Sequence, residues 1–492
     1  MLHHLVLSLI LTSAKSIGVL GSVAIAVNSL AGPAVLQLPY QYQLSGLLPT
    51  TLCIIAVGIL SALCSLHMAN AISMIPQNRN FDKCMEFSDP FRIFWSEHWY
   101  KVTQILFFLT TVCLNIAAIV DTAETVDSTL GFHWKTAGYS FDSMELFTWS
   151  HAPCTRRDVK LGVCDPFDGQ DTGNFLLTIG YLLTTAVFLP ICLADLKENT
   201  VWQIVGFLLL LSTSCYFCFD LSQYHLTTEH VSVMGTEWTS MLGVILFNFS
   251  LVLAIPAWLH EKKPDVSVAR TVVVSTVIST TLYIAVGVIG ALAIPKVNVN
   301  MLSPMLSGAF GKGIQFAASV FAFFIIGLDI PLFSVLTRYN LTHSGLCSER
   351  TANLLVVWIP WSLSWAFYTG NSIGDLLDWG GVFLTSAVAF LLPLYLALRA
   401  LRQQPADDYM GSVTVSGSRA CLQSKTARET ALVVLFGVAA LAVAVAIGGQ
   451  VWTSEIEEEY RHSIAYLNSS SVTELKAGVD GMLVYRGWPF SF

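Results

Sequence analysis

The sequence predicts an all-α membrane protein with about eleven transmembrane helices. Composition is the first observation behind this prediction: the 492 residues are 54% hydrophobic and only 12% charged. The mean hydropathy is +0.63. A soluble globular domain has about 25% charged residues, so this chain has too few to cover a surface that faces water. We therefore expect a single integral membrane unit.

The second observation is the length and spacing of the apolar runs. A run of about 20 residues crosses roughly 30 Å of hydrocarbon at about 1.5 Å per residue. Such runs recur along the whole chain, and polar residues are confined to short segments between them. The expected spans are 18–44, 48–72, 100–126, 174–193, 201–221, 238–259, 271–294, 313–337, 352–368, 379–398 and 430–451.

The third observation is the distribution of Lys and Arg, which are retained on the cytoplasmic side of membranes. The segments before the first span and after each even-numbered span carry most of the basic residues, from Lys15 to Arg428. This favours a cytosolic N-terminus and an extracytosolic C-terminus. The sequon at Asn468 then lies on the side where glycosylation occurs, and we expect Asn468 to be its acceptor.

The first ten runs divide into two sets of five. Because five is odd, the second set enters the membrane from the opposite side, which is inverted-repeat topology. The expected organisation is a short cytoplasmic tail, two repeats, a cytoplasmic loop, an eleventh span and an acidic extracytosolic tail. These segments cover residues 1–17, 18–223, 224–400, 401–429, 430–451 and 452–492, respectively.

The first span of each set has a polar interruption near its middle. In span one the interruption is Asn28-Ser29-Leu30-Ala31-Gly32-Pro33, and Pro33 cannot donate a backbone hydrogen bond. In span six Asn248 and Ser250 lie near the centre, and Pro256 follows. One kinked span would be ordinary in a membrane protein, but paired interruptions of an inverted repeat favour a binding site. Free N–H groups at the half-helix starts suit a carboxylate.

The first interruption also carries a resemblance to a known family. Residues 28–40 (NSLAGPAVLQLPY) resemble the first-helix signature of the amino acid/auxin permease family, N-x-x-x-G-x-G-x-L-x-x-P-Y, and match five of its six fixed positions. The departure is Ala34, where the family usually has its second glycine. Further similarity lies at 81–89 and at 331–338, and in coarse plan the resemblance covers about residues 15–450.

The resemblance to this family, which belongs to the amino acid-polyamine-organocation superfamily, implies a LeuT-like fold of two inverted five-helix repeats plus one peripheral helix. It also implies a cation-coupled amino acid symporter that works by alternating access. By position, Asn28 corresponds to the family's coupling-ion asparagine. Ser29, Leu30, Ala31 and Gly32 correspond to the unwound segment that holds the substrate carboxylate.

Asp329 is the remaining candidate for the ion site, because a bare charge inside a membrane span costs several kcal/mol on insertion scales. Helical steps back from Asp329 reach Ile325, Ala322, Ala318 and Gln315, a partly small and polar stripe that we expect to face other helices. Sodium-coupled relatives have a hydroxyl at this position. Either the carboxylate ligates Na⁺ or it accepts a coupling proton, and we favour the proton. A carboxylate that merely reaches the cytoplasmic interface is the structural alternative.

The favoured function is secondary active transport of amino acids, with Asn28 and Asp329 at the coupling-ion site and the two interruptions, including Asn248 and Ser250, at the substrate. The alternative is a non-transporting amino acid sensor on the same fold. The sequence contains no nucleophile-base arrangement or phosphate-binding loop, so we expect no enzyme activity, no cofactor beyond a co-transported H⁺ or Na⁺, and no nucleic-acid partner. No metal site other than a possible Na⁺ site is expected. Both the plasma membrane and a vacuole- or lysosome-type membrane suit these spans.

Cys154 and Cys164 lie in the long polar stretch after the third span, which the predicted orientation places outside the cytosol. Disulfides persist in such compartments, so we expect these two residues to form one, with two free thiols as the alternative.

Overall fold

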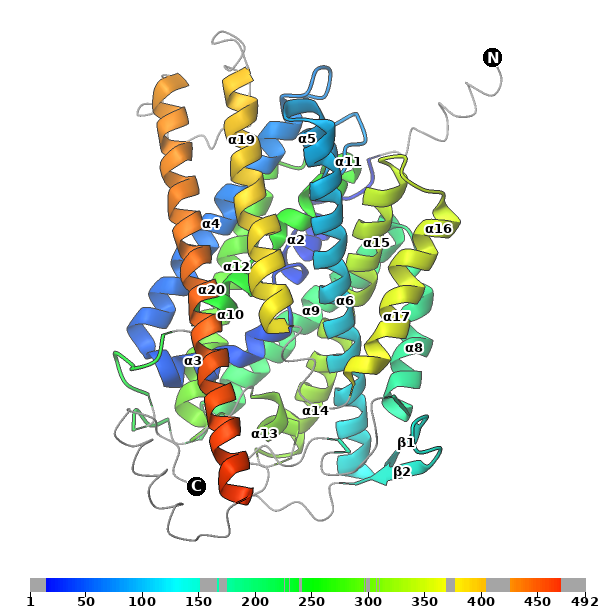
Figure 1. The fold of residues 1–492 in the computed structure, drawn as a ribbon, viewed down its shortest axis with the longest axis vertical. Helices are drawn as coiled ribbons and strands as arrows, with labels where there is room; N and C mark the ends of the chain where they lie inside the picture. The colour runs from blue at the N-terminus through cyan, green and yellow to red at the C-terminus, as the bar shows by residue number, and fades with distance from the viewer. Residues whose placement is uncertain are drawn as a thin grey trace.

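The structure is a computed structural model, and it describes most of the chain. The described residues are 15–150, 166–167, 175–224, 226–229, 231–238, 241–295, 297, 301–306, 308, 310–368, 377–403 and 425–469. They form a bundle of long helices with a small sheet at one end (Figure 1). We call the end that holds α5 and α11 the N-side, and the end that holds the sheet the opposite side.

Eight helical segments among the described residues are long and apolar enough to cross a membrane by themselves. They overlap the second, third, fifth, sixth, seventh, eighth, tenth and eleventh predicted runs, and most of them extend beyond the predicted bounds. The other three runs are helical as well. The first run is broken into pieces, the fourth is the 14-residue helix α8, and the ninth is a succession of short helical segments. The helical membrane architecture expected from the sequence is therefore observed, with a small sheet in addition.

The helices and strands have the following bounds. In the first five runs and their connections they are α2 (Val19–Asn28), η1 (Pro33–Gln37), α3 (Leu38–Ser45), α4 (Leu47–Ser73), α5 (Asp89–Phe94), α6 (Glu97–His133), β1 (Thr136–Ser140), β2 (Leu146–Trp149), β3 (Leu176–Thr178), α8 (Ile179–Cys192) and α9 (Leu196–Leu221). The next segments are α10 (Met241–Asn248), η2 (Leu251–Leu253), α11 (Ile255–Glu261), α12 (Val268–Ala293), α13 (Leu302–Leu306), α14 (Lys312–Val320), η3 (Phe321–Ile326) and α15 (Asp329–Thr342). The last segments are α16 (Glu349–Asn353), η4 (Leu354–Trp358), α17 (Ile359–Ser364), η5 (Trp365–Phe367), η6 (Leu377–Thr385), η7 (Ala387–Leu391), α19 (Leu392–Gln403) and α20 (Lys425–Ser469).

Local sequence explains where several long helices begin. Ser96, Thr178 and Ser267 precede α6, α8 and α12, and each side-chain oxygen accepts a hydrogen bond from a backbone N–H in the first turn. These caps satisfy backbone donors that a helix start leaves without an intrahelical partner. Ser96 and Ser267 lie outside the predicted runs 100–126 and 271–294, whereas Thr178 lies inside the predicted run 174–193.

The eighth span contains a wider helical turn at η3, where Phe321–Ile326 forms a π-helix between α14 and α15. A π-helical turn contains more residues than an α-helical turn, and π-bulges occur frequently at functional sites. Helical steps taken on an α-helical period therefore lose register at this point. The predicted stripe is nevertheless buried throughout, from Gln315 to Ile325.

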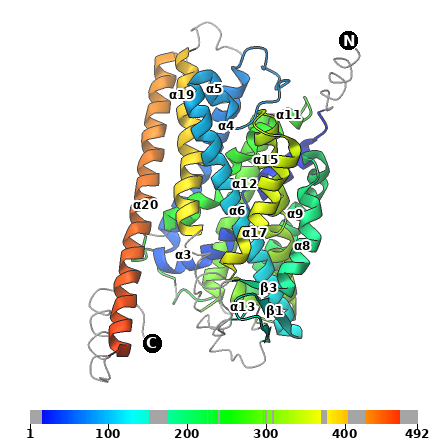
Figure 2. The same cartoon turned by 45° about the vertical axis from the view of Figure 1, so that its right-hand side comes forward.

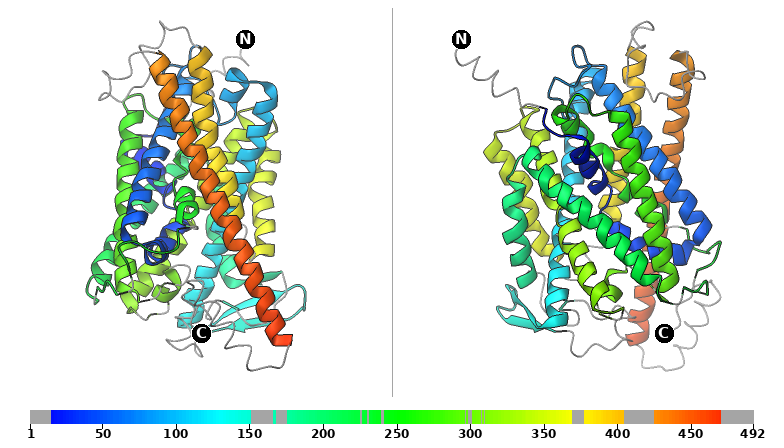
Figure 3. Two further views of the ribbon diagram at one scale, coloured as in Figure 1. Left: turned by 60° about the vertical axis from the view of Figure 1, so that its left-hand side comes forward. Right: turned by 180° about the vertical axis from the view of Figure 1, so that it is seen from behind.

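Helix α20 runs along the outside of the bundle and packs on α19 and α10 (Figures 2 and 3). The sequence predicted a span at 430–451, but the helix extends over 45 residues, from Lys425 to Ser469. The apolar run marks the part that lipid can surround, and it does not mark where the helix ends. Because α20 begins on the N-side, its last turns lie on the opposite side (Figure 1).

A three-stranded antiparallel sheet on the opposite side follows α6, in the order β2-β1-β3. Thr136 pairs with Trp149, and Gly138 pairs with Thr178. β1 and β2 lie in the stretch that the sequence predicted as a polar loop, and β3 lies at the start of the predicted fourth span 174–193, so none of the strands was predicted. Cys154 and Cys164 lie outside the described residues, so their predicted disulfide stays a prediction.

Candidate functional site

Both predicted helix interruptions are present, and they contact each other. Helix α2 ends at Asn28, and the chain resumes helical turns only at Pro33, after Gly32 in an extended conformation (φ −68°, ψ 179°). Helix α10 ends at Asn248, and η2 begins at Leu251. The Ser250 hydroxyl donates a hydrogen bond to the Ser29 carbonyl oxygen at 3.3 Å. The two breaks therefore meet at one place within the bundle.

The side chains predicted to surround a substrate are buried there. Ser29, Leu30, Ala31, Asn248 and Ser250 are each exposed by 5% or less. The Ser29 hydroxyl bonds the Ala26 carbonyl at 3.0 Å, whereas the Asn248 amide nitrogen bonds the Val244 carbonyl at 3.1 Å. The Asn248 side-chain oxygen has no hydrogen-bond partner among the described residues. A buried acceptor without a donor is costly, so this oxygen is suited to receive a donor from a ligand.

Asn28 joins the first break to helix α9. Its amide nitrogen lies 2.8 Å from both the backbone oxygen and the side-chain oxygen of Gln203. The Gln203 amide nitrogen in turn donates to the Leu328 carbonyl at 3.1 Å. In the described part of the chain the Asn28 side-chain oxygen has no partner. The network thus reaches from the predicted ion-site asparagine to the residue that precedes Asp329.

Asp329 begins α15, directly after the π-helical turn and the Gly327-Leu328 step. Its side chain faces the first break: one carboxylate oxygen lies 4.0 Å from the position that a β-carbon on Gly32 would occupy. The residue is 3% exposed. No described residue donates a hydrogen bond to this carboxylate. The observed position argues against the alternative of an interfacial acid and against exposure to lipid.

The sequence analysis missed the residues that hold the second break. The Ser61 hydroxyl on α4 donates to the Phe249 carbonyl at 2.9 Å. The Phe249 ring packs edge-on against Tyr283 at a centroid distance of 5.2 Å. Gly58 gives this ring room, because a β-carbon there would lie 3.3 Å from it. A serine and a glycine inside an apolar run are too common in membrane helices to have signalled this role.

Gln203 was missed as well, although a signal existed. Asn199 and Gln203 are two buried amides one helical turn apart near the start of α9. Polar side chains in membrane helices almost always face the bundle interior, and a pair on one face marks that interior side. Together they would have predicted which face of α9 is turned inward, although not its partner.

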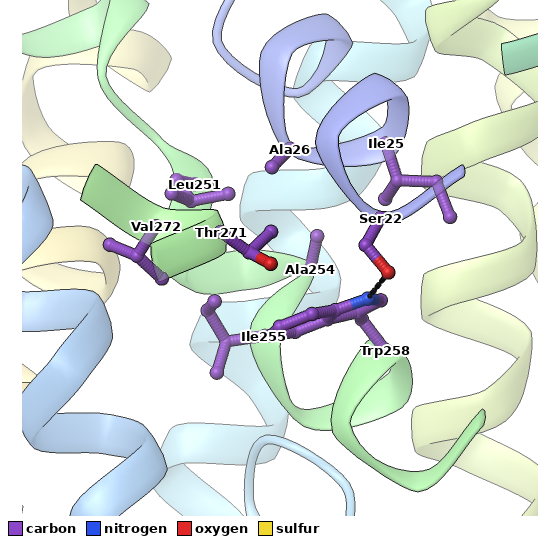
Figure 4. A pocket seen from close by; sticks show the side chains of 9 residues that line it. All are labelled: Ser22, Ile25, Ala26, Leu251, Ala254, Ile255, Trp258, Thr271 and Val272. Atoms are coloured by element: carbon purple, nitrogen blue, oxygen red, sulfur yellow. Dashed lines mark hydrogen bonds between the residues drawn. The ribbon is translucent and has the colours of Figure 1, made fainter. Parts of the chain in front are cut away.

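On the N-side of the breaks, α2 and α11 pack closely around a small cavity (Figure 4). Trp258 Nε1 donates to the Ser22 hydroxyl at 2.9 Å across this interface. The cavity measures about 10 Å³, near the limit for one water molecule, whereas ligand pockets hold about 300–1,000 Å³. It is lined by Ser22, Ile25, Ala26, Leu251, Ala254, Ile255, Trp258, Thr271 and Val272. This interface therefore separates the breaks from the N-side.

The N-terminal segment reinforces that closure. The backbone N–H groups of Ser16 and Ile17 donate to the Glu261 carbonyl at the end of α11, at 2.9 and 3.1 Å. Lys15 forms a salt bridge with Asp82 of the loop after α4, with a nitrogen–oxygen distance of 2.7 Å. The segment before α2 is thus bonded both to α11 and to the loop after α4, which an opening motion would separate from it.

The fold resembles that of Mhp1, a transporter of the nucleobase-cation-symport-1 family, in a closed conformation with bromovinylhydantoin bound. The TM-score is 0.52 at 13% sequence identity, over 90% of this chain and 93% of that chain. Mhp1 is among 92 chains of solved structures that match, whereas no curated protein sequence matches.

The fold is the LeuT-like fold that the family resemblance implied. Residues 15–407 match the family of transmembrane amino acid transporter proteins, and the chain belongs to that family. It is therefore a transporter and not an enzyme, and the family implies an amino acid as the substrate. The expected family and the expected cargo class are confirmed.

Proposed function

We propose that this protein is a proton-coupled secondary active transporter of amino acids that works by alternating access. The observation that carries the proposal is the position of Asp329, a buried carboxylate that no described donor bonds and that faces the first helix break. A bare carboxylate at such a depth is unfavourable, whereas a protonated one is neutral. Binding of a proton and binding of the substrate at Gly32 would therefore favour each other.

The two breaks supply complementary groups for a zwitterion. The Gly32 backbone N–H, immediately before η1, suits the α-carboxylate, because Pro33 has no N–H and a helix start concentrates positive dipole ends. The unpaired side-chain oxygen of Asn248 suits the α-ammonium group. Ser250 and Ser29 hold the two breaks together through their 3.3 Å hydrogen bond. Release toward the N-side requires α2 and α11 to separate, which breaks the Trp258–Ser22 bond.

Sodium coupling is the alternative that the experiment must separate. The unpaired Asn28 oxygen and the Asp329 carboxylate are both hard oxygen ligands. A sodium ion needs several oxygens at once, whereas a proton needs only the carboxylate. We favour the proton for this reason.

The test is uptake of an amino acid panel into proteoliposomes of the full chain, driven separately by a proton gradient and by a sodium gradient. We expect proton-driven accumulation, and we expect Asp329→Asn to lose its dependence on the proton gradient while substrate exchange persists. Asp220→Asn, a matched change at the end of α9, should behave as the unmodified protein does. Proton-driven accumulation that survives in Asp329→Asn, or accumulation that follows only sodium, would overturn the proton assignment. Substrate binding without uptake under any gradient would favour the sensor.

We also propose that the N-side is cytosolic and that Asn468, in the last turn of α20, is extracytosolic. The distribution of basic residues supports this orientation. Treatment of membranes with an endoglycosidase should increase the electrophoretic mobility of the full chain, and Asn468→Gln should abolish that increase. Removal of the C-terminal residues by a protease that is present only in the cytosol would contradict this orientation. Whether Cys154 and Cys164 are bridged can be read from alkylation with and without prior reduction.

A further inference from the structure

A thiol, a carboxylate and an imidazole converge on the N-side, away from the helix breaks. Cys84 and Glu86 lie in the loop after α4, whereas His343 directly follows α15. The His343 Nδ1 atom lies 3.1 Å from Cys84 Sγ and 2.7 Å from Glu86 Oε1. Cys84 Sγ and Glu86 Oε1 are 3.7 Å apart. The three atoms therefore form a compact triangle of metal-ligating types.

The surrounding chain fixes this triangle from both sides. The Asn78 side-chain oxygen accepts from the Lys83 backbone N–H at 2.8 Å, next to Cys84. Asp89 accepts from the Glu86 backbone N–H at 2.9 Å and from the Ser344 hydroxyl at 2.9 Å. Asp89 thus connects the segment that carries Cys84 and Glu86 to the segment that carries His343. Such outer contacts orient metal ligands and make a site rigid before the ion binds.

We propose that Cys84, Glu86 and His343 form a Zn²⁺ site that joins the loop after α4 to the end of α15. Thiolate, imidazole and carboxylate are the ligands that Zn²⁺ takes, at about 2.0–2.3 Å from the metal, and ligand atoms at those distances lie roughly 3–4 Å from one another. The three observed separations lie close to that range. Hard ions such as Mg²⁺ and Ca²⁺ disfavour a thiolate, so the donor set selects Zn²⁺ among the common ions.

Access and charge agree with this assignment. The His343 side chain is 36% exposed and the Glu86 side chain is 3% exposed, so an ion could arrive from the N-side solvent and meet a buried anion. A thiolate and a carboxylate together would neutralise the two charges of Zn²⁺, and a water molecule would complete a tetrahedral set. The metal would compensate the buried carboxylate more fully than a hydrogen bond does.

The site lies between the two repeats, so a bound ion would affect transport. Cys84 and Glu86 belong to the first predicted repeat and His343 belongs to the second, and Glu86 and His343 are 257 positions apart in the sequence. A bound ion would therefore cross-link the two repeats on the N-side and oppose their separation. We expect Zn²⁺ to inhibit transport and to raise the thermal stability of the protein.

The decisive measurement uses Co²⁺ as a spectroscopic substitute for Zn²⁺ on the purified full chain. Thiolate-bound Co²⁺ has a near-ultraviolet charge-transfer band, which Zn²⁺ should abolish by displacement. We expect Cys84→Ser to lose the band, and Glu86→Gln and His343→Gln to weaken Zn²⁺ binding at least about tenfold. Cys347→Ser and His98→Gln are the matched controls, because both residues lie on the N-side outside the triangle, and both should keep the band.

A hydrogen-bonded cluster that binds no metal would give no band in the unmodified protein, and that result would overturn the proposal. A band that persists in Cys84→Ser would overturn it too, because another cysteine would then hold the metal. Melting of each variant in the presence of a chelator checks that it folds. If Cys84→Ser does not fold, the loss of Zn²⁺-dependent stabilisation in His343→Gln decides the question instead.

Discussion

The break in the first span and the break in the sixth span occupy corresponding positions in the two repeats, yet their surroundings differ. Around Gly32 the chain offers backbone groups and a carboxylate 4.0 Å from where a β-carbon would lie. Around Phe249 a large ring is buried against Tyr283, and Ser61 bonds the backbone. On the proposed function, the first break offers backbone groups to the substrate, whereas the second offers the unpaired Asn248 oxygen next to a ring that packing anchors. Variants at Phe249 and its contacts should therefore affect stability, whereas variants at Gly32 should affect transport.

The largest expected effect on stability is that of Phe249→Ala. The ring is 1% exposed, and loss of a buried Phe side chain costs about 3–5 kcal/mol because a cavity remains. The measurement is the apparent melting temperature of the detergent-purified protein. Phe316→Ala, at a side chain that is 71% exposed, is the control and should change that temperature little. Equal effects of the two variants would mean that Phe249 is not an anchor.

Gly58→Ala should be the next in size. A β-carbon at Gly58 would lie 2.8 Å from Thr280 Oγ1 and 3.3 Å from the Phe249 ring, so α4 and α12 must shift. Overpacking of this kind costs about 1–3 kcal/mol. The same melting assay measures it, and Gly18→Ala, where a β-carbon meets no atom within 4 Å, is the comparison. Restoration of stability in a Gly58→Ala, Thr280→Ala double variant would support the steric reason.

Ser61→Ala should have a smaller effect. It removes the 2.9 Å hydrogen bond to the Phe249 carbonyl, and interhelical hydrogen bonds in membranes contribute about 0.6 kcal/mol on average. Replacement by threonine keeps the hydroxyl and should retain most of the stability. A loss as large as that of Phe249→Ala would assign the anchoring to the hydrogen bond and not to the ring.

Gly32→Ala should change stability least, by less than about 0.5 kcal/mol, because its φ of −68° suits any residue and a β-carbon would meet only Asp329 at 4.0 Å. Uptake should nevertheless fall, since the added methyl group lies where the substrate carboxylate is proposed to bind. The uptake assay and the melting assay together test the contrast between the two breaks. Normal uptake in Gly32→Ala and in the bulkier Gly32→Val would show that the substrate does not bind at the first break.

Sequence reasoning located the spans and the two breaks because both depend on local composition. The length of an apolar run and the missing N–H of a proline are properties of a single helix. The 18–44 run and Pro33 were therefore enough to predict the first span and its break. The burial of Asp329 was predictable for the same reason, since neighbouring small residues marked an inward face. The predicted roles of these residues in binding stay predictions.

Contacts between distant segments were not predictable in the same way. Gln203 meets Asn28 across 175 residues, and His343 meets Cys84 across 259 residues. Such pairs depend on how the helices pack, which no local pattern encodes. The π-helical turn at 321–326 is another example, because its extra residue is accommodated by neighbouring helices rather than dictated by the apolar sequence. The strands of the sheet after α6 were likewise not predicted from the sequence.

Helix α20 has a geometric consequence on the opposite side. At about 1.5 Å per residue its 45 residues extend roughly 68 Å, more than twice the thickness of the hydrocarbon layer. The 18 residues from 452 to 469 alone account for about 27 Å, so the helix can project past the lipid headgroups as a rod. A large molecule that approaches this face next to α20 would contact the projecting helix before it contacts the bundle.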